Sequence, residues 1–161
     1  MATEVDHSST VDERATTTVR DVTYDLLRAY GLTTIFGNVG STEQPFLANF
    51  PPDFRYVLGL QEASVIAMAD AGQQTREMLL LEPYLTNTEP TMLPRPWVKW
   101  AYQPARAQDV PAAFMRAIAT ALQPPAGPVF LSLPLDDWDK PSAGPAVVRT
   151  VATRVAPDPA R

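Results

Sequence analysis

Cysteine is absent from this 161-residue sequence, and histidine occurs once, as His7 in a polar N-terminal stretch. Without cysteine the chain can form no disulfide, no thiolate metal site and no cysteine nucleophile. A lone histidine outside any apolar pattern argues against a Ser-His-Asp triad and a histidine-rich metal site, because both need an imidazole in a packed site. We therefore expect no metal site built from this chain's own side chains.

Glycine is also scarce, with 7 residues against 17 prolines, and proline stands at about twice its usual frequency of ~5 %. Neither GxGxxG nor GxxxxGK[ST] occurs, so dinucleotide and P-loop sites lose their main support. The net charge of -5 offers no cationic footprint for nucleic acid. No apolar run approaches the roughly 18 residues of a membrane span, and the first residues lack the order of a secretory signal. We expect a cytoplasmic protein that binds neither nucleic acid nor membrane.

The chain divides into three predicted parts. Residues 1–15 are polar without an apolar period, which predicts a disordered tail. Residues 141–161 contain four prolines and alternate small with apolar residues, which predicts a Pro-rich linker or tail. The candidate folded domain is therefore 16–140.

The hydrophobic pattern of that domain predicts an α/β fold. The capping-box sequence from Thr18 to Asp21, the apolar spacing that follows and Gly31 predict a helix over 18–30. Further helices are expected over 41–49, 61–70 and 108–122. Buried strands are expected at 33–37, 55–60 and 128–133, with a short strand within 97–102. Helices alternating with short apolar strands favour a parallel sheet with flanking helices.

Parallel sheets bind ligands at the carboxyl ends of their strands, which directs attention to the turn at 37–44 and the junction at 60–63. Glu62 follows a predicted strand in the first turn of an apolar helix. One interpretation is a carboxylate that the helix dipole stabilises, which is the more frequent case. The other is a partly buried carboxyl group whose raised pKa lets it share a proton with a ligand nitrogen.

Ser41 also allows two interpretations, which are compatible with each other. Its hydroxyl can cap the N-terminus of the helix expected over 41–49. It can also hold a substrate carboxylate at that N-terminus, where anions are already favoured. Asp136, Asp137 and Asp139 match no calcium-loop spacing, and we expect them to be solvated charges after the last strand.

Several long stretches carry a resemblance that is more specific than any short motif. They read YDLLRAYGLTTIFGNVGSTEQPFL, FRYVLGLQEASVIAMAD, AGQQTREM, LTN, LPRPWVKWAYQPA and GPVFLSLPLDDWDK, and they cover nearly all of 19–140. In them the chain resembles the N-terminal pyrimidine-binding domain of thiamine-diphosphate-dependent enzymes, and most closely the benzoylformate decarboxylases. The resemblance implies thiamine diphosphate as cofactor, a 2-oxo acid such as benzoylformate as substrate, and carbon–carbon lyase chemistry.

The resemblance also implies roles for individual residues. Glu62 matches the glutamate that hydrogen-bonds N1′ of the cofactor's aminopyrimidine, and Ser41 matches the serine that contacts the substrate carboxylate. The turn expected to bind the cofactor with Glu62 contains Gly37, Asn38 and Gly40. The residues that align with the lining of the substrate pocket are Tyr84 and Leu85.

The sequence departs from the family's pattern in ways that bear on activity. Val39 stands where the family usually has proline. After Asp70 the family continues through a βαβ unit that carries an active-site histidine, and here the chain passes directly to Ala71. A βαβ unit takes about 30 residues or more, and the missing segment amounts to about forty. The fold implied is therefore a parallel sheet reduced by loss of an internal βαβ portion, and His7 offers no replacement.

The matching stretches end where the family's middle domain would begin, and no motif for Mg²⁺ and the diphosphate occurs in this sequence. Mg²⁺ is therefore expected only through a diphosphate domain that this sequence does not contain. One hypothesis is a decarboxylase component, inactive alone, that works with a separate diphosphate-domain chain or as a homo-oligomer. The other is a non-catalytic remnant that acts at most as an interaction module.

Overall fold

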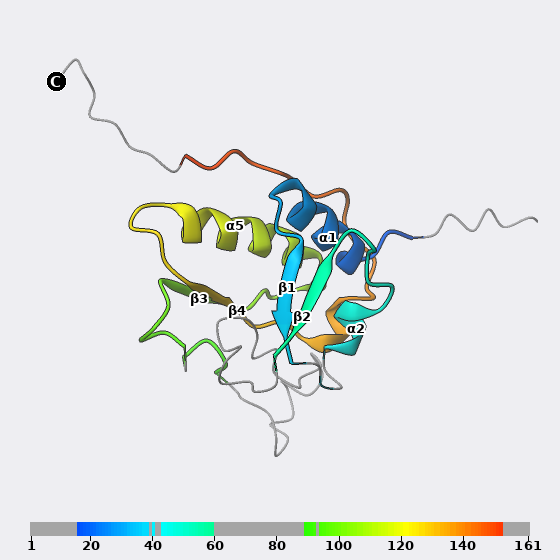
Figure 1. The fold of residues 1–161 in the computed structure, drawn as a ribbon, viewed down its shortest axis with the longest axis horizontal. Helices are drawn as coiled ribbons and strands as arrows, with labels where there is room; N and C mark the ends of the chain where they lie inside the picture. Colours follow the sequence, from blue (N-terminus) through cyan, green and yellow to red (C-terminus); the bar gives the residue numbers. More distant parts are fainter. Residues whose placement is uncertain (1–15, 39, 41–42, 60–88, 93, 153–161) are drawn as a thin grey trace, which may run out of the picture.

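A computed structural model describes residues 16–38, 40, 43–59, 89–92 and 94–152 (Figure 1). The elements, in chain order, are α1 (Val19–Ala29), β1 (Thr34–Gly37), α2 (Gln44–Leu47), β2 (Arg55–Leu58), β3 (Trp100–Tyr102), the 3₁₀ turn η1 (Ala107–Asp109), α5 (Val110–Leu122), β4 (Val129–Leu131) and the 3₁₀ turn η2 (Leu135–Asp137). The predicted helix over 61–70 lies outside the described residues. No helix in the described ranges is long and apolar enough to cross a membrane.

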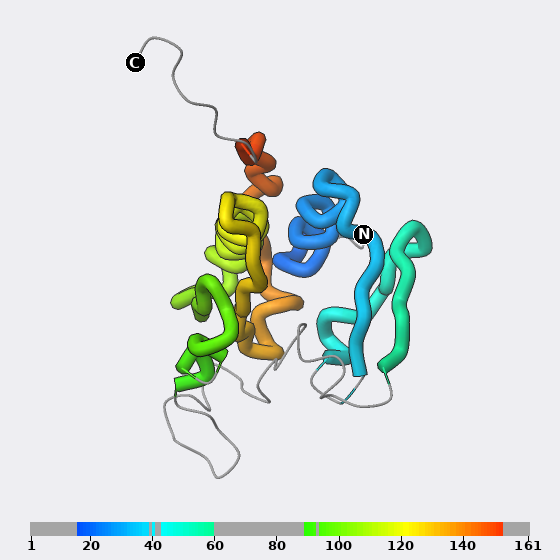
Figure 2. Tube along the Cα trace, turned by 60° about the vertical axis from the view of Figure 1, so that its left-hand side comes forward, coloured from blue at the N-terminus to red at the C-terminus, as the bar shows by residue number. Residues whose placement is uncertain are grey.

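The strands form two parallel pairs. β1 pairs with β2, so that Thr34 lies opposite Arg55 and Gly37 opposite Leu58. β3 pairs with β4. In Figure 2, α1 lies between the β1–β2 pair and α5. This arrangement of parallel strands and covering helices confirms the predicted α/β class.

Helix α1 begins and ends as the sequence predicts. The Thr18 hydroxyl accepts a hydrogen bond from the Asp21 amide at 3.2 Å, and the Thr18 amide donates to Asp21 Oδ2 at 2.9 Å. These reciprocal bonds form the capping box. Gly31 follows the helix with a φ of +68°, in the left-handed region that ends many helices. The capping motifs therefore set both ends of α1.

The core forms where α1 packs against the rest of the domain. Val19 and Val110 are fully buried beside Trp138. A second cluster contains Tyr24, Leu27 and Phe54, with further apolar side chains packed against it: Ile35, Phe46, Phe50, Phe114 and Ile118. Because the two clusters share Phe46 and Phe114, α1, α2 and α5 are joined into one packed unit.

The strands of the β1–β2 pair are less buried than predicted. Ile35 packs on the cluster under α1, but Phe36 on the opposite face is 48 % exposed. Leu58 of β2 is 59 % exposed. Successive side chains of a strand face opposite sides of a sheet, so Phe36 points away from the α1 cluster that Ile35 joins. Leu58 lies opposite Gly37, on the same face as Ile35 but outside that cluster. The prediction of buried strands at 33–37 and 55–60 was therefore wrong for these side chains.

Helix α2 is shorter than the predicted 41–49. It begins at Gln44, its N-cap is Glu43, and no side chain caps it. Proline in its first turn fixes φ but supplies no amide, so the helix needs fewer capping bonds there. The chain leaves helical geometry at Ala48, whose ψ is 133°, and Asn49 adopts a φ of +54°. The two prolines that follow prevent a return to helix.

The aspartates after β4 are not all solvated. Asp137 is completely buried, whereas Asp139 remains largely exposed and pairs with Arg20. The prediction of three solvated charges was wrong for Asp137, because the chain turns back under α1 at η2 and encloses this side chain with Trp138. Residues 138 and 140 accept hydrogen bonds from the first amides of α1 at 3.1 and 2.9 Å.

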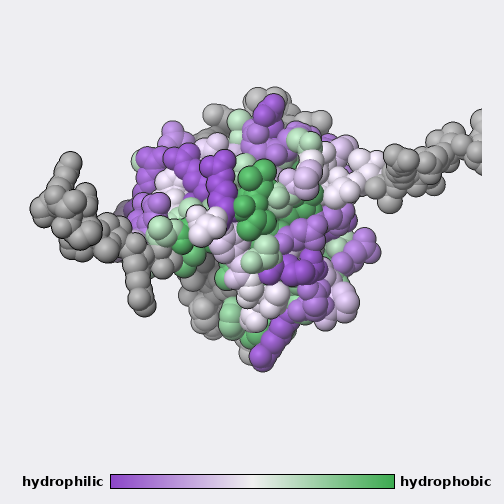
Figure 3. Space-filling view, turned by 90° about the horizontal axis from the view of Figure 1, so that it is seen from above, coloured by the Kyte–Doolittle hydropathy of each residue, from purple (hydrophilic) through white to green (hydrophobic). Residues whose placement is uncertain are grey.

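The segment after Lys140 runs beside α1. Ser142 donates its amide to the Thr17 carbonyl at 2.9 Å, and the Tyr30 hydroxyl donates to the Arg149 carbonyl. Figure 3 looks down on the side where α1, α5 and this segment lie, and hydrophilic residues are interspersed with apolar ones on that surface.

Candidate functional site

The carboxyl ends of β1 and β2 meet at two glycines. The Gly59 amide donates to the Gly37 carbonyl at 2.8 Å, which extends the parallel pairing to the edge of the sheet. The chain then leaves β1 through Asn38 and Gly40. Three residues predicted to bind the cofactor, Gly37, Asn38 and Gly40, thus lie together at the edge where α/β folds bind ligands.

Gly37 leaves room for close packing at this edge. A Cβ built on Gly37 would lie 3.1 Å from Cζ and 3.3 Å from Cε2 of Tyr56, and closer still to its hydroxyl. Real Cβ atoms do not tolerate such contacts without movement of the neighbour. The Tyr56 ring therefore lies directly against the backbone at the end of β1 and limits the space there.

Glu43, which precedes α2, binds the chain that leaves β1. Its Oε2 accepts a hydrogen bond from the Gly40 amide at 2.6 Å. Burial raises the pKa of the Tyr56 hydroxyl, and the negative charge of Glu43 raises it further. The phenol of Tyr56 is therefore protonated at neutral pH and can donate a hydrogen bond at this edge.

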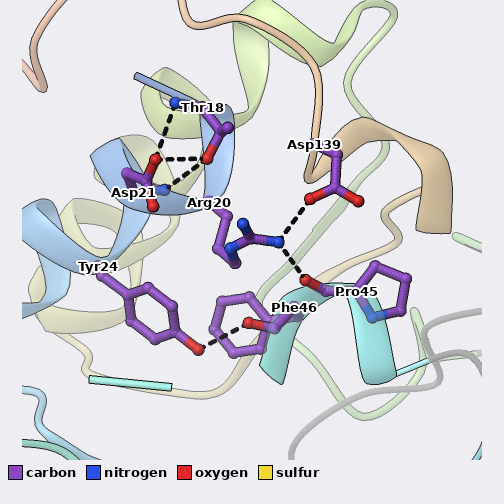
Figure 4. Close-up of polar contacts among 7 residues, drawn as sticks. All are labelled: Thr18, Arg20, Asp21, Tyr24, Pro45, Phe46 and Asp139. Carbon is purple, nitrogen blue, oxygen red and sulfur yellow. Dashed lines mark hydrogen bonds and ion pairs between the residues drawn. The ribbon is translucent and has the colours of Figure 1, made fainter. Parts of the chain in front are cut away.

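Helix α1 supports α2 with two side chains, drawn in Figure 4. Arg20 Nη1 donates to the Pro45 carbonyl at 2.8 Å and to Asp139 Oδ1 at 2.5 Å. The Tyr24 hydroxyl donates to the Phe46 carbonyl at 2.7 Å, and its ring stacks on Phe46 with centroids 4.9 Å apart. Burial raises the pKa of Tyr24 to about 12, so its hydroxyl stays protonated and donates throughout the neutral range.

Four predicted site residues, Ser41, Glu62, Tyr84 and Leu85, lie outside the described residues. Sequence reasoning missed Tyr56 and Glu43, which the fold brings to the same edge as Gly37. The signal for Glu43 was its position three residues after Gly40, the spacing of a local side-chain-to-amide bond. Tyr56 gave no local signal, because its contact with Gly37 depends on the pairing of two strands.

The described part of the site lacks the features of a diphosphate site. A diphosphate needs cationic side chains, a metal or a glycine-rich helix start. Among the described residues, no group of three or more metal-ligating side chains occurs.

Comparison with known proteins gives the decisive observation. Residues 17–79 match the family model "Thiamine pyrophosphate enzyme, N-terminal TPP binding domain". Over this segment the chain is similar to that N-terminal TPP-binding domain. The segment includes Gly37, Asn38 and Gly40 as well as Ser41 and Glu62, so the candidate site falls within the matched TPP-binding domain. Thiamine diphosphate is the cofactor of these domains.

Relatives of known structure match the rest of the chain as well. An X-ray structure from Mycobacterium smegmatis, assigned as a thiamin diphosphate-dependent enzyme, is 55 % identical over 89 % of this chain, with a TM-score of 0.82. Benzoylformate decarboxylase from Polynucleobacter necessarius is 50 % identical over the same share, with a TM-score of 0.80. Both agreements extend well beyond residue 79 and include the second half of the fold.

The alignment with a curated relative shows how many positions have no counterpart in this chain. Benzoylformate decarboxylase from Pseudomonas aeruginosa is 42 % identical over 177 aligned positions, which include 85 % of this chain. Since 85 % of 161 residues is about 137, about 40 positions of the alignment have no residue of this chain. This is the size predicted from the break after Asp70. The chain spans 33 % of that relative and 35 % and 34 % of the two solved structures.

Proposed function

We propose that this chain supplies the pyrimidine-binding half of a thiamine diphosphate site in a 2-oxo-acid decarboxylase of benzoylformate decarboxylase type. The observation that carries the proposal is the match of residues 17–79 to the TPP-binding domain, with Gly37, Asn38 and Gly40 at the carboxyl edge of a parallel pair. The identities of 42 to 55 % to thiamine-dependent relatives support it.

In this proposal the cofactor, when bound, supplies the electron sink for the loss of CO2 from a 2-oxo acid. Glu62 holds a proton at N1′ of the aminopyrimidine, because a carboxyl group in a partly buried position can have a pKa close to neutral. Ser41 binds the substrate carboxylate through its hydroxyl. Tyr84 and Leu85 line the substrate pocket and select for the side chain of the 2-oxo acid.

The chain is proposed to be inactive alone. The described residues offer no metal-binding cluster for Mg²⁺ and the diphosphate. In this proposal a second domain supplies these ligands. That domain belongs to a separate diphosphate-domain chain or to another subunit of a homo-oligomer. Activity would then require assembly, and the cofactor would bind between two domains.

Calorimetric titration of the purified chain with thiamine diphosphate and Mg²⁺ tests the cofactor site directly. We expect saturable binding that weakens about tenfold or more in Glu62→Gln, because the amide cannot share its proton with N1′ in the same way. Glu89→Gln, an exposed glutamate, is the matched control and should bind like the wild type. Equal binding by both variants would refute the role of Glu62.

A competing proposal is a non-catalytic remnant that acts at most as an interaction module. It is favoured by one observation, the exposure of Phe36 and Leu58 on the β1–β2 pair, which leaves apolar surface uncovered. A mixture of this chain with a diphosphate-domain chain, cofactor and Mg²⁺ separates the two. Release of CO2 from benzoylformate above that of the partner alone supports the decarboxylase, and no release at saturating cofactor supports the remnant.

A further inference from the structure

Two side chains of α1 bind successive carbonyls of α2. Arg20 and Tyr24 are four residues apart, so they lie on the same face of the helix. Arg20 Nη1 reaches the Pro45 carbonyl at 2.8 Å and the Tyr24 hydroxyl reaches the Phe46 carbonyl at 2.7 Å. Figure 4 shows both side chains directed from α1 towards the short α2 helix.

These carbonyls need donors from outside α2. The last carbonyls of any helix have no intrahelical partner, and α2 is only four residues long. The amides that would serve Pro45 and Phe46 belong to Asn49 and Phe50. The chain leaves helical geometry at Ala48, and Asn49 is left-handed. Arg20 and Tyr24 therefore cap the carboxyl end of α2 in place of the missing turn.

Stability alone does not explain an arginine at position 20. Its residue is 6 % exposed, its Nε is buried without a hydrogen-bond partner, and its ion partner Asp139 is largely exposed. It also places a positive charge in the first turn of α1, where the helix dipole disfavours it. A well-packed apolar side chain usually costs less than a buried ion. The guanidinium is better explained by its hydrogen bond to Pro45, which joins α1 to α2.

We propose that Arg20 and Tyr24 are positioning residues that fix α2 and thereby hold Glu43 and Gly40 at the cofactor edge. This rests on the proposed function, since it deepens the role of Gly40 there. Glu43 directly precedes Gln44, the first residue of α2, so a shift of α2 displaces Glu43 as well. The bond from the Gly40 amide to Glu43 ties Gly40 to the start of the same helix.

Amide hydrogen exchange tests, without any ligand, whether Arg20 and Tyr24 fix α2. We call these two side chains and their bonds to α2 the clamp. The Leu47 and Ala48 amides donate to the Glu43 and Gln44 carbonyls and report on α2. We expect exchange at these two amides to rise about 2- to 10-fold in Tyr24→Phe and about 10- to 100-fold in Arg20→Met, as expected for a neutral and a charged hydrogen bond. Arg20→Lys keeps a cationic donor and should recover part of the protection.

Matched controls come from the same helix. Arg28→Met removes an exposed arginine whose partners are Asp25 and Asp53, and Tyr30→Phe removes a hydroxyl that contacts Met115 and Arg149. Neither touches α2, so both should leave exchange at Leu47 and Ala48 unchanged. Exchange of the Ala117 amide, in the buried middle of α5, serves as the internal reference for global opening. Equal acceleration at Ala117 and Leu47, or none at Leu47, would overturn the role of Arg20 and Tyr24 at α2.

Cofactor titration of the same variants distinguishes positioning from stability. Measured well below the melting temperature, Tyr24→Phe should weaken thiamine diphosphate binding severalfold and Arg20→Lys should bind more tightly than Arg20→Met. If the wild type binds the cofactor and the variants bind it with the same affinity despite faster exchange at α2, the positioning role is overturned. If the wild type does not bind at all, the proposed function fails, whereas the clamp is still decided by exchange at Leu47 and Ala48.

Discussion

At the scale of single residues, the capping box of α1 couples stability to pH. Burial alone would raise the pKa of Asp21, but hydrogen bonds from the Thr18 amide and hydroxyl outweigh it and lower that pKa below 3.8. A lowered pKa in the folded state stabilises the fold above the unfolded value. This stability is fully present above about pH 4 and is lost as the pH falls through the folded pKa.

Replacement of Thr18 by alanine should therefore have two effects. The free energy of unfolding should fall by about 1 kcal/mol at pH 7, as for other lost N-caps. The loss of stability between pH 5 and pH 3 should also become shallower, because the bonds that lower the pKa of Asp21 are weakened. Urea denaturation at a series of pH values measures both. Thr18→Ser keeps the hydroxyl and should follow the wild type at every pH.

Gly37 and Tyr56 should behave as a coupled pair. Gly37→Ala places a Cβ against the Tyr56 ring at 3.1 Å, so it should destabilise the fold by about 1–3 kcal/mol, the usual cost of overpacking. In a Tyr56→Ala background the same substitution should cost much less, since the ring is gone. A double-mutant cycle of thermal or urea unfolding gives the coupling energy. Additive effects of the two substitutions would contradict the observed packing.

At the scale of elements, local motifs predicted the helices better than the strands. The capping box and Gly31 set both ends of α1, and the apolar spacing over 108–122 predicted α5 almost to the residue. These signals work because a helix is specified by neighbours in sequence. The burial of strands depends on what covers each face. Apolar residues such as Phe36 and Leu58 therefore predicted strands correctly and burial wrongly.

The site was predictable only where one element carries it. Gly37, Asn38 and Gly40 follow β1 directly, so the position of the strand was enough to place them. Tyr56 reaches Gly37 across a strand pair, and Arg20 reaches Pro45 from a helix 25 residues earlier. No local pattern contains such contacts, because they depend on how elements pack. Resemblance to a family filled part of this gap for Ser41 and Glu62.

The carboxyl end of helix α5 is bound by Lys99, which directly precedes β3. Lys99 Nζ donates to the Thr120 carbonyl at 2.7 Å and to the Gln123 carbonyl at 2.6 Å, where the helix dipole favours a cation. Lys99→Met should lower the free energy of unfolding by about 0.5–1.5 kcal/mol, which differential scanning calorimetry can measure. Arg95→Met, at another exposed basic residue, is the control. A loss of equal size there would show that the effect comes from net charge alone.

At the scale of the whole molecule, the exposed apolar side chains of β1 and β2 are explained by the positions that this chain lacks compared with its relative. Parallel α/β sheets are normally covered on both faces, yet Phe36 is 48 % and Leu58 59 % exposed, and the described strands form two separate pairs. The alignment with the Pseudomonas aeruginosa relative contains about 40 positions without a counterpart here. A βαβ unit of about that length supplies strands and a helix that could cover these side chains.

Insertion of the corresponding segment of that relative after Asp70 should therefore stabilise the chain. We expect a higher melting temperature and weaker fluorescence of a dye that binds exposed apolar surface, because Phe36 and Leu58 become covered. A flexible Gly-Ser insert of equal length is the control, and loop entropy alone should make it neutral or slightly destabilising. If both inserts gave the same melting temperature and dye signal, the exposure of Phe36 and Leu58 would owe nothing to the missing segment. A higher melting temperature and a weaker dye signal with the relative's segment alone would show that the β1–β2 pair keeps surfaces on which that segment packs.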